Sequence, residues 1–150
     1  MRRAGIRLAL SVVVLTPAYY YLLVFIVGWT SAVPWPTWWL ELFPSRRVGV
    51  MVWMVSLHTM GVFSAALPVA IASVAIARKH AWQLGGIVAF LATVAALLPS
   101  LSPEIWPLIW SGPRVLFVTD QIKLIVAVPL VAWIVGSASA PQPRVAQPHG

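Results

Sequence analysis

The sequence predicts an all-α polytopic membrane protein whose four transmembrane helices pack as two hairpins. Of its 150 residues, 61% are hydrophobic and only 9% are charged, whereas soluble domains carry about 25% charged residues. The 10 basic and 3 acidic residues are too few to give the folded chain a water-facing surface, so we expect lipid to solvate most of it. The chain also contains four apolar runs of about the length that a membrane-spanning helix needs, roughly 20 residues.

The first apolar run covers residues 8–29 and follows three arginines. A secretory signal peptide begins in the same way, so cleavage after this run is an alternative. However, the apolar region of a signal peptide is only about 7–15 residues long and ends at small residues. This run is longer, carries no charge, and contains Tyr19, Tyr20 and Tyr21. We therefore expect a retained first span, kinked at Pro17 because proline lacks the backbone N–H that a helix uses.

The second and third runs, 48–77 and 84–101, are separated by the short polar turn Arg78-Lys79-His80. The second run is longer than one span needs, so we expect it to tilt. Both runs have residues with short side chains four positions apart, which allows helix backbones to approach closely. We expect the second run to be the most buried of the four. The residues at this spacing are Gly61, Ala65, Val69 and Ser73 in the second run, and Gly85, Ala89 and Thr93 in the third.

Two short loops, 30–47 and 102–113, are rich in tryptophan and proline. Tryptophan favours the headgroup level of a bilayer, where its ring is buried and its N–H is hydrated. We therefore predict that both loops lie at the outer membrane interface, the first as a short helix or turn. Their similar composition raises the hypothesis of a duplicated hairpin, as some transporters show. The alternative is that two interfacial loops use the same residue types for the same physical reason.

The fourth run covers residues 114–136, and the Pro-, Ala- and Gln-rich segment 137–150 predicts a disordered cytoplasmic tail. Only Leu124–Gly136 is strictly apolar, and its length of about 20 Å is less than the roughly 30 Å of hydrocarbon. One solution is a helix that begins near Arg114 and carries Asp120 and Lys123 into the membrane. In the other, Lys123 extends to the outer headgroups and the inner end of the helix is longer.

The first solution predicts a polar cluster inside the bundle. Asp120 and Lys123 are three residues apart and would share a helix face, and an isolated charge at that depth costs at least about 2–3 kcal/mol. His58 lies ten residues into the second run, at a similar depth, beside Thr59. We expect these residues to group between the second and fourth spans, where they would bind a polar headgroup, gate a proton or lock the bundle. The alternative for His58 is a neutral ring hydrogen-bonded to a neighbouring helix.

The basic residues outside the spans indicate the orientation. With the N-terminus in the cytoplasm, six of them lie inside and three outside, which is the bias that cytoplasmic loops show. Both termini are then cytoplasmic, and the compact chain and N-terminal arginines favour the inner (plasma) membrane of a bacterium. The charged residues expected at the outer interface are Glu41, Arg46, Arg47, Glu104 and Arg114.

Composition also limits the chemistry. The chain has no cysteine, which excludes disulfides and thiolate ligands, and its three histidines are too scattered to predict a metal site. We expect no cofactor. The basic residues are dispersed among apolar runs, so no face is predicted for nucleic acid. The partners we expect are the lipid bilayer and other membrane proteins, or a second copy of the chain.

Three functional hypotheses follow, and the residues favour a non-enzymatic role over an enzymatic one. The first is a small accessory, assembly, regulatory or immunity-type subunit that acts by protein or lipid contacts, because the chain has short loops and small-residue helix faces. The second is an oligomeric small transporter or channel that uses His58, Asp120 and Lys123. The third is a membrane-embedded enzyme on a lipid or isoprenoid, with Glu41 and Glu104 as acid–base groups.

Overall fold

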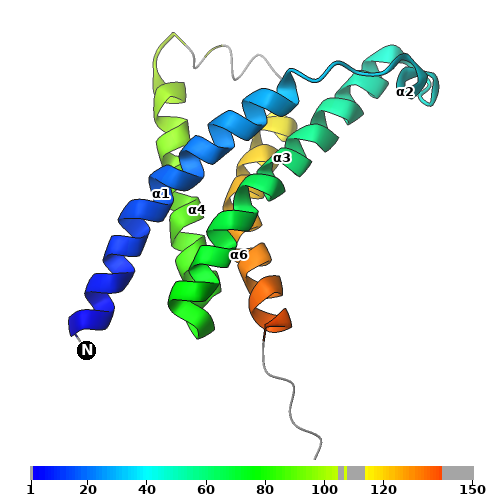
Figure 1. Ribbon diagram of the computed structural model, residues 1–150. Helices are drawn as coiled ribbons and strands as arrows, with labels where there is room; N and C mark the ends of the chain where they lie inside the picture. Colours follow the sequence, from blue (N-terminus) through cyan, green and yellow to red (C-terminus); the bar gives the residue numbers. More distant parts are fainter. Residues whose placement is uncertain (1, 105–106, 108–113, 140–150) are drawn as a thin grey trace, which may run out of the picture.

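A computed structural model of the chain describes residues 2–104, 107 and 114–139 (Figure 1). All of its regular structure in those residues is helical. We call the end of the bundle that carries the short helix α2 the outer end, and the opposite end, where α3 turns into α4, the inner end. The helices are α1 (Arg2–Ser31), α2 (Thr37–Glu41), α3 (Arg46–Ala77), α4 (Ala81–Leu97) and α6 (Arg114–Ala138), with 3-10 turns η1 (Arg78–His80) and η2 (Leu98–Leu101).

Three stretches of these helices are long and apolar enough to cross a membrane: Gly5–Thr30, Arg46–Leu97 and Phe117–Ala138. The middle stretch contains α3 and α4, which run in opposite directions (Figure 1). Large apolar side chains such as Phe25 and Trp29 are exposed on the outside of the bundle, as expected where lipid is the solvent. The prediction of an all-α chain is confirmed, and these three stretches are candidate spans of a multi-pass membrane protein.

Three of the helices extend beyond the predicted spans, whereas α4 covers Ala81–Leu97 instead of the predicted 84–101, because residues Leu98–Leu101 form the 3-10 turn η2. α3 begins at Arg46, two residues earlier than predicted, because the Ser45 hydroxyl accepts a hydrogen bond from the Val48 N–H at 3.3 Å and caps the helix. α6 begins at Arg114, as in the first of the two solutions for the fourth run, and continues to Ala138. Helix therefore takes in the first two residues of the segment predicted to be disordered, and residues 140–150 lie outside the described part.

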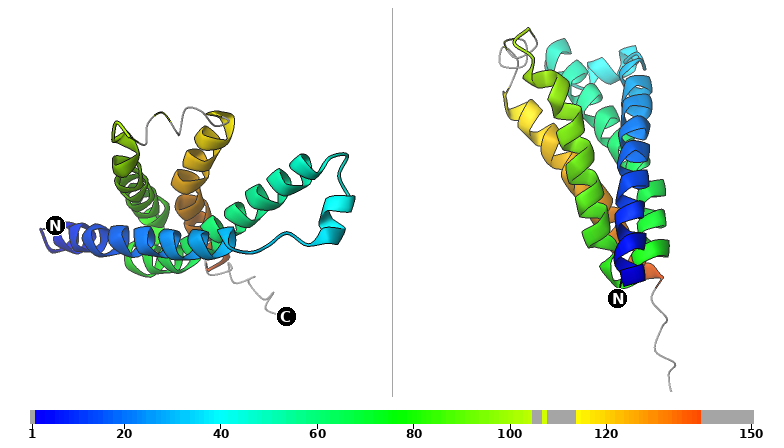
Figure 2. Two further views of the ribbon diagram at one scale, coloured as in Figure 1. Left: turned by 90° about the horizontal axis from the view of Figure 1, so that it is seen from above. Right: turned by 90° about the vertical axis from the view of Figure 1, so that its left-hand side faces the viewer.

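The helices α1 and α3 lie in contact and run antiparallel, as do α4 and α6 (Figures 1 and 2). Both α1 and α6 also pack against the central α3 and α4. Eight of the fifteen buried hydrophobic residues are alanines, so the backbones approach closely where the four helices cross. The small residues predicted on α3 and α4 are buried there. In proportion, α4 is more buried than α3, with seven of 17 residues against eight of 32, so the expectation that α3 would be the most buried holds in number only.

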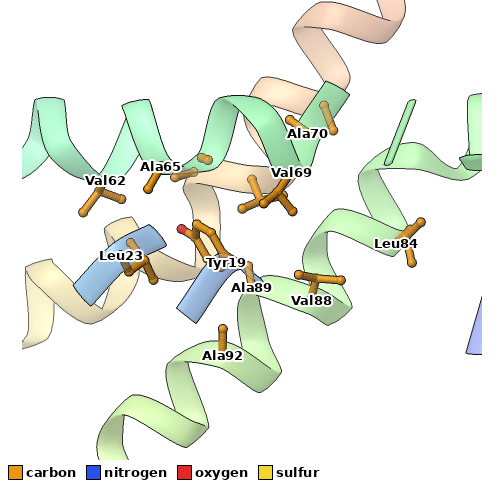
Figure 3. Packing of buried hydrophobic residues seen from close by; sticks show 14 of the residues in the cluster. Tyr19, Leu23, Val62, Ala65, Val69, Ala70, Leu84, Val88, Ala89 and Ala92 are labelled. Atoms are coloured by element: carbon orange, nitrogen blue, oxygen red, sulfur yellow. The ribbon is translucent and has the colours of Figure 1, made fainter. Parts of the chain in front are cut away.

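Tyr19 occupies the centre of this crossing (Figure 3). Its side chain is fully buried, and its ring lies among short side chains that include Ala65 of α3 and Ala89 of α4. Its hydroxyl donates a hydrogen bond to the Leu124 carbonyl of α6 at 3.2 Å. This bond joins α1 to the backbone of α6, five residues before Pro129.

The outer part of α3 diverges from the bundle and carries α2 with it (Figure 2). The two are joined by aromatic contacts: Trp39 packs edge-on against Trp53 with ring centres 5.2 Å apart, and its Nε1–H donates to the Gly49 carbonyl at 2.9 Å. Gly49 packs closely here, because a Cβ at this position would lie 3.1 Å from Leu40 and 3.2 Å from Phe43. The Trp/Pro segment is thus a short helix fixed to α3.

Adjacent glycines of α4 give a test of the close packing. A Cβ on Gly85 would lie 3.0 Å from Val128 of α6, whereas a Cβ on Gly86 would meet nothing within 4 Å. We expect Gly85→Ala to lower the free energy of unfolding by about 1–3 kcal/mol through overpacking. Gly86→Ala serves as the matched control and should leave stability unchanged or slightly raised, because alanine favours helix. Unfolding of both variants in detergent micelles measures this, and equal losses would contradict the packing.

Candidate functional site

Three of the residues predicted to form a polar cluster meet between α3 and α6. The Lys123 ammonium donates a hydrogen bond to Asp120 Oδ1 at 3.0 Å. His58 Nε2 lies 3.9 Å from the same oxygen, which is too long for a hydrogen bond but close enough for an ion pair if the ring is protonated. Asp120 Oδ1 therefore lies between a cation and an imidazole, and the pair of Asp120 and Lys123 leaves the cluster neutral overall when His58 is neutral.

The starting residue of α6 decides how far along the helix Asp120 and Lys123 lie. Since α6 begins at Arg114, Asp120 lies about 9 Å and Lys123 about 13 Å along its axis. The spacing of three residues places both on one face. The three side chains are 21–33% exposed, so the cluster is half-buried rather than open to the surroundings of the bundle.

The cluster opens onto a cleft of about 230 Å³ at the outer end of the bundle. The diverging outer part of α3 forms its floor, the end of α1 and the chain that follows form one side, and Asp120 of α6 closes the other. Ten residues line the cleft: Thr30, Val33, Trp35, Met51, Trp53, Met54, Val55, Leu57, His58 and Asp120. Most of this lining is apolar, with the His58/Asp120 pair as its main polar feature.

Two ring nitrogens in the cleft have no hydrogen-bond partner among the residues that the structure describes. They are Trp53 Nε1 and His58 Nε2, and both atoms are buried. A buried polar atom without a partner costs about 1–3 kcal/mol, so a group that enters the cleft and forms a hydrogen bond with either nitrogen would be stabilised there. Trp53 also holds α2 in place through its contact with Trp39, which fixes the position of its N–H in the cleft.

Thr59 was predicted to join the cluster, and the described contacts do not link it to the other members. Its hydroxyl donates to the Val55 carbonyl of its own helix at 2.7 Å. Gln121, beside Asp120, has a buried Oε1 atom without a hydrogen-bond partner in the described part of the chain. The cluster that the geometry supports is therefore His58, Asp120 and Lys123.

The remaining charged residues of the predicted outer interface do not form a site together. Arg46 and Arg47 are exposed at the start of α3, and Glu41 and Glu104 are also exposed. The segment around α2 that holds Glu41 and the turn after α4 that holds Glu104 lie on opposite sides of the outer end (Figure 2). The two carboxylates therefore do not face each other, which removes the geometric basis for joint acid–base chemistry. The Arg114 side chain lies outside the described part.

Sequence reasoning missed the cleft itself, although a signal for its floor was present. Met51, Met54 and His58 follow one another at spacings of three and four, which places them on one helix face. The sides of the cleft come from α1 and α6, and their distance from this face depends on the angle at which α3 diverges.

The described residues contain no group of three or more metal-ligating side chains. Comparison of the chain with known protein families, curated proteins and solved structures finds no match. Its function therefore has to be inferred from the geometry of the cleft.

The ion pair can be tested with a double-mutant cycle. Asp120→Asn or Lys123→Met alone leaves an unpaired charge in a half-buried, apolar setting, and we expect each to lower the free energy of unfolding by about 1–3 kcal/mol. The double variant should lose less than the sum of the two, with a coupling of at least about 0.5 kcal/mol. Unfolding in micelles measures all four proteins. Strictly additive losses would mean that both charges are solvated independently.

Proposed function

We propose that this chain is a small multi-pass protein of the inner membrane that acts by binding a transmembrane helix of a second membrane protein in the outer cleft. In this proposal four helices span the membrane and both termini are cytoplasmic. The observation that carries it is the uncovered outer part of α3. Between Gly49 and Gly61 no residue of α3 is buried, and Met51, Met54 and Met60 are exposed.

The chemistry of this face supports a protein partner. Methionine side chains are flexible and polarisable, and they are common at surfaces that adapt to a binding partner. In a membrane, apolar area alone gives helices no reason to leave lipid, so association depends on close packing and on interhelical hydrogen bonds. Trp53 Nε1 and His58 Nε2 lie in the cleft without a described partner, and a carbonyl or hydroxyl of an incoming helix would satisfy them.

The size of the cleft also favours a helix over a whole small molecule. Its volume of about 230 Å³ is below the range of about 300–1,000 Å³ that is common for ligand pockets. It suits one or two side chains of a helix laid along α3. Accessory, assembly, regulatory and immunity-type subunits all act through contacts of this kind.

A photo-crosslinking amino acid introduced at position 54 tests this proposal. Met54 lines the cleft, and we expect a discrete adduct with a second protein in native membranes. Ile71 gives the matched control, because it is similarly exposed on the same helix but outside the cleft, and should give no such adduct. Met51→Trp should abolish the adduct by filling the cleft. Equal labelling from both positions, or an adduct at twice the mass of the chain itself, would contradict a distinct partner.

A second candidate, an oligomeric transporter or channel, is favoured by one observation: His58, Asp120 and Lys123 meet within the bundle. Ionisable groups at such a place are typical of proton and ion pathways. If the chain is a transporter or channel, the unaltered protein should carry protons or a solute into proteoliposomes. We expect this flux to fall by at least about tenfold in Asp120→Asn, because the acceptor between His58 and Lys123 loses its charge. Glu104→Gln, which neutralises an exposed acid, should keep full flux. Absence of flux in the unaltered protein would remove this candidate.

A further inference from the structure

A second recess lies at the inner end, away from the cleft. Its volume is about 870 Å³, and it lies between the end of α3, the start of α4 and the end of α6. Its polar lining includes Arg78 and Lys79, both exposed, with Ser137 and Ser139 of the α6 end. In the described part of the chain neither basic side chain takes part in an ion pair.

An apolar groove of about 620 Å³ begins beside this recess and runs between α4 and α6. From Trp82 to Phe90 it follows α4 for about 12 Å. Gly86 deepens it, because no atom lies within 4 Å of where its Cβ would be. The α6 side is formed by Ile125, Val126, Pro129 and Leu130.

Trp82 joins the two spaces, because it lines both the recess and the groove. Trp133 lines the recess from α6, one helical turn beyond Leu130 of the groove. Both indoles are more than half exposed. Tryptophan at such a place marks the headgroup level of a bilayer, so the recess lies at that level and the groove extends into the hydrocarbon.

The charges of the whole chain select one kind of occupant. All three acidic residues, Glu41, Glu104 and Asp120, belong to the outer part of the molecule, so the positive charge of Arg78 and Lys79 is uncompensated at the inner end. Basic recesses between membrane helices suit phosphate headgroups. An apolar groove that starts at such a recess and runs parallel to the helices suits an acyl chain of the same molecule.

We propose that the inner recess and the α4/α6 groove form a binding site for one anionic phospholipid. Its phosphate lies against Arg78 and Lys79, with the glycerol region between Trp82 and Trp133. One acyl chain follows the groove past Gly86. This site depends on the membrane location of the chain and is independent of what binds the outer cleft.

The first test asks whether the site selects an anionic headgroup. The full chain in detergent is titrated with phosphatidylglycerol and, separately, with phosphatidylcholine of the same acyl chains. Native mass spectrometry gives the affinities, and we expect clear preference for phosphatidylglycerol. Arg78→Gln/Lys79→Gln should weaken its binding about 30-fold. Arg46→Gln/Arg47→Gln is the matched control, because it removes two exposed charges from the other end of α3, and should leave binding unchanged.

The groove is tested separately with the charges intact. Gly86→Leu should fill the groove and weaken phosphatidylglycerol binding about tenfold, the loss expected when about two methylene groups lose their contact. Gly28→Leu is the control, since Gly28 of α1 also has open space around it and does not line the groove.

Three outcomes would overturn the proposal. The first is equal affinity for the two lipids, and the second is an equal loss of affinity in the Arg78/Lys79 and Arg46/Arg47 double variants. The third is full competition by inorganic phosphate at the concentration of the lipid, which would assign the recess to a free anion. If the Arg78/Lys79 variant does not fold, Arg78→Gln alone gives the same test with a smaller expected loss, about fivefold.

Discussion

The burial of Tyr19 at the crossing of the four long helices is the constraint on which the rest of the structure depends. An aromatic ring fits there only because its neighbours on α3 and α4 are alanines and other small residues. Its hydroxyl donates a hydrogen bond to the Leu124 carbonyl of the α6 backbone. One side chain thus connects α1 to three helices, and in lipid such packing and hydrogen bonding replace the hydrophobic effect as the cause of association.

Openings lie at both ends of the bundle. The outer part of α3 diverges from the other helices and lines the cleft (Figure 2). At the inner end, α3, α4 and α6 line a recess. The outer opening combines exposed methionines with a half-buried ion pair, whereas the inner one combines two uncompensated cations with exposed tryptophans. The two ends therefore differ in chemistry, which is why we propose a helix as the partner of one and a phospholipid as the ligand of the other.

Residue pattern alone led to the hypothesis of a polar cluster of His58, Thr59, Asp120 and Lys123, and the reason is a length constraint. The strictly apolar part of the fourth run is shorter than the hydrocarbon, so a helix that begins near Arg114 carries Asp120 and Lys123 into it, whereas in the alternative Lys123 extends to the outer headgroups. Their spacing of three residues then makes the pair. Thr59 shows the limit of the method, because a threonine hydroxyl can bond to its own helix backbone, as it does with Val55.

The amino-acid sequence by itself determined the all-α class, the membrane-length helices and the small faces of α3 and α4, since each depends on local composition and helical period. The start of α6 at Arg114 was one of two solutions that the sequence left open. Only the tertiary structure decided the central place of Tyr19, the cleft beside His58 and the inner recess that Trp82 and Trp133 both line. These depend on the angles at which helices cross, which are fixed by contacts among residues far apart in the chain.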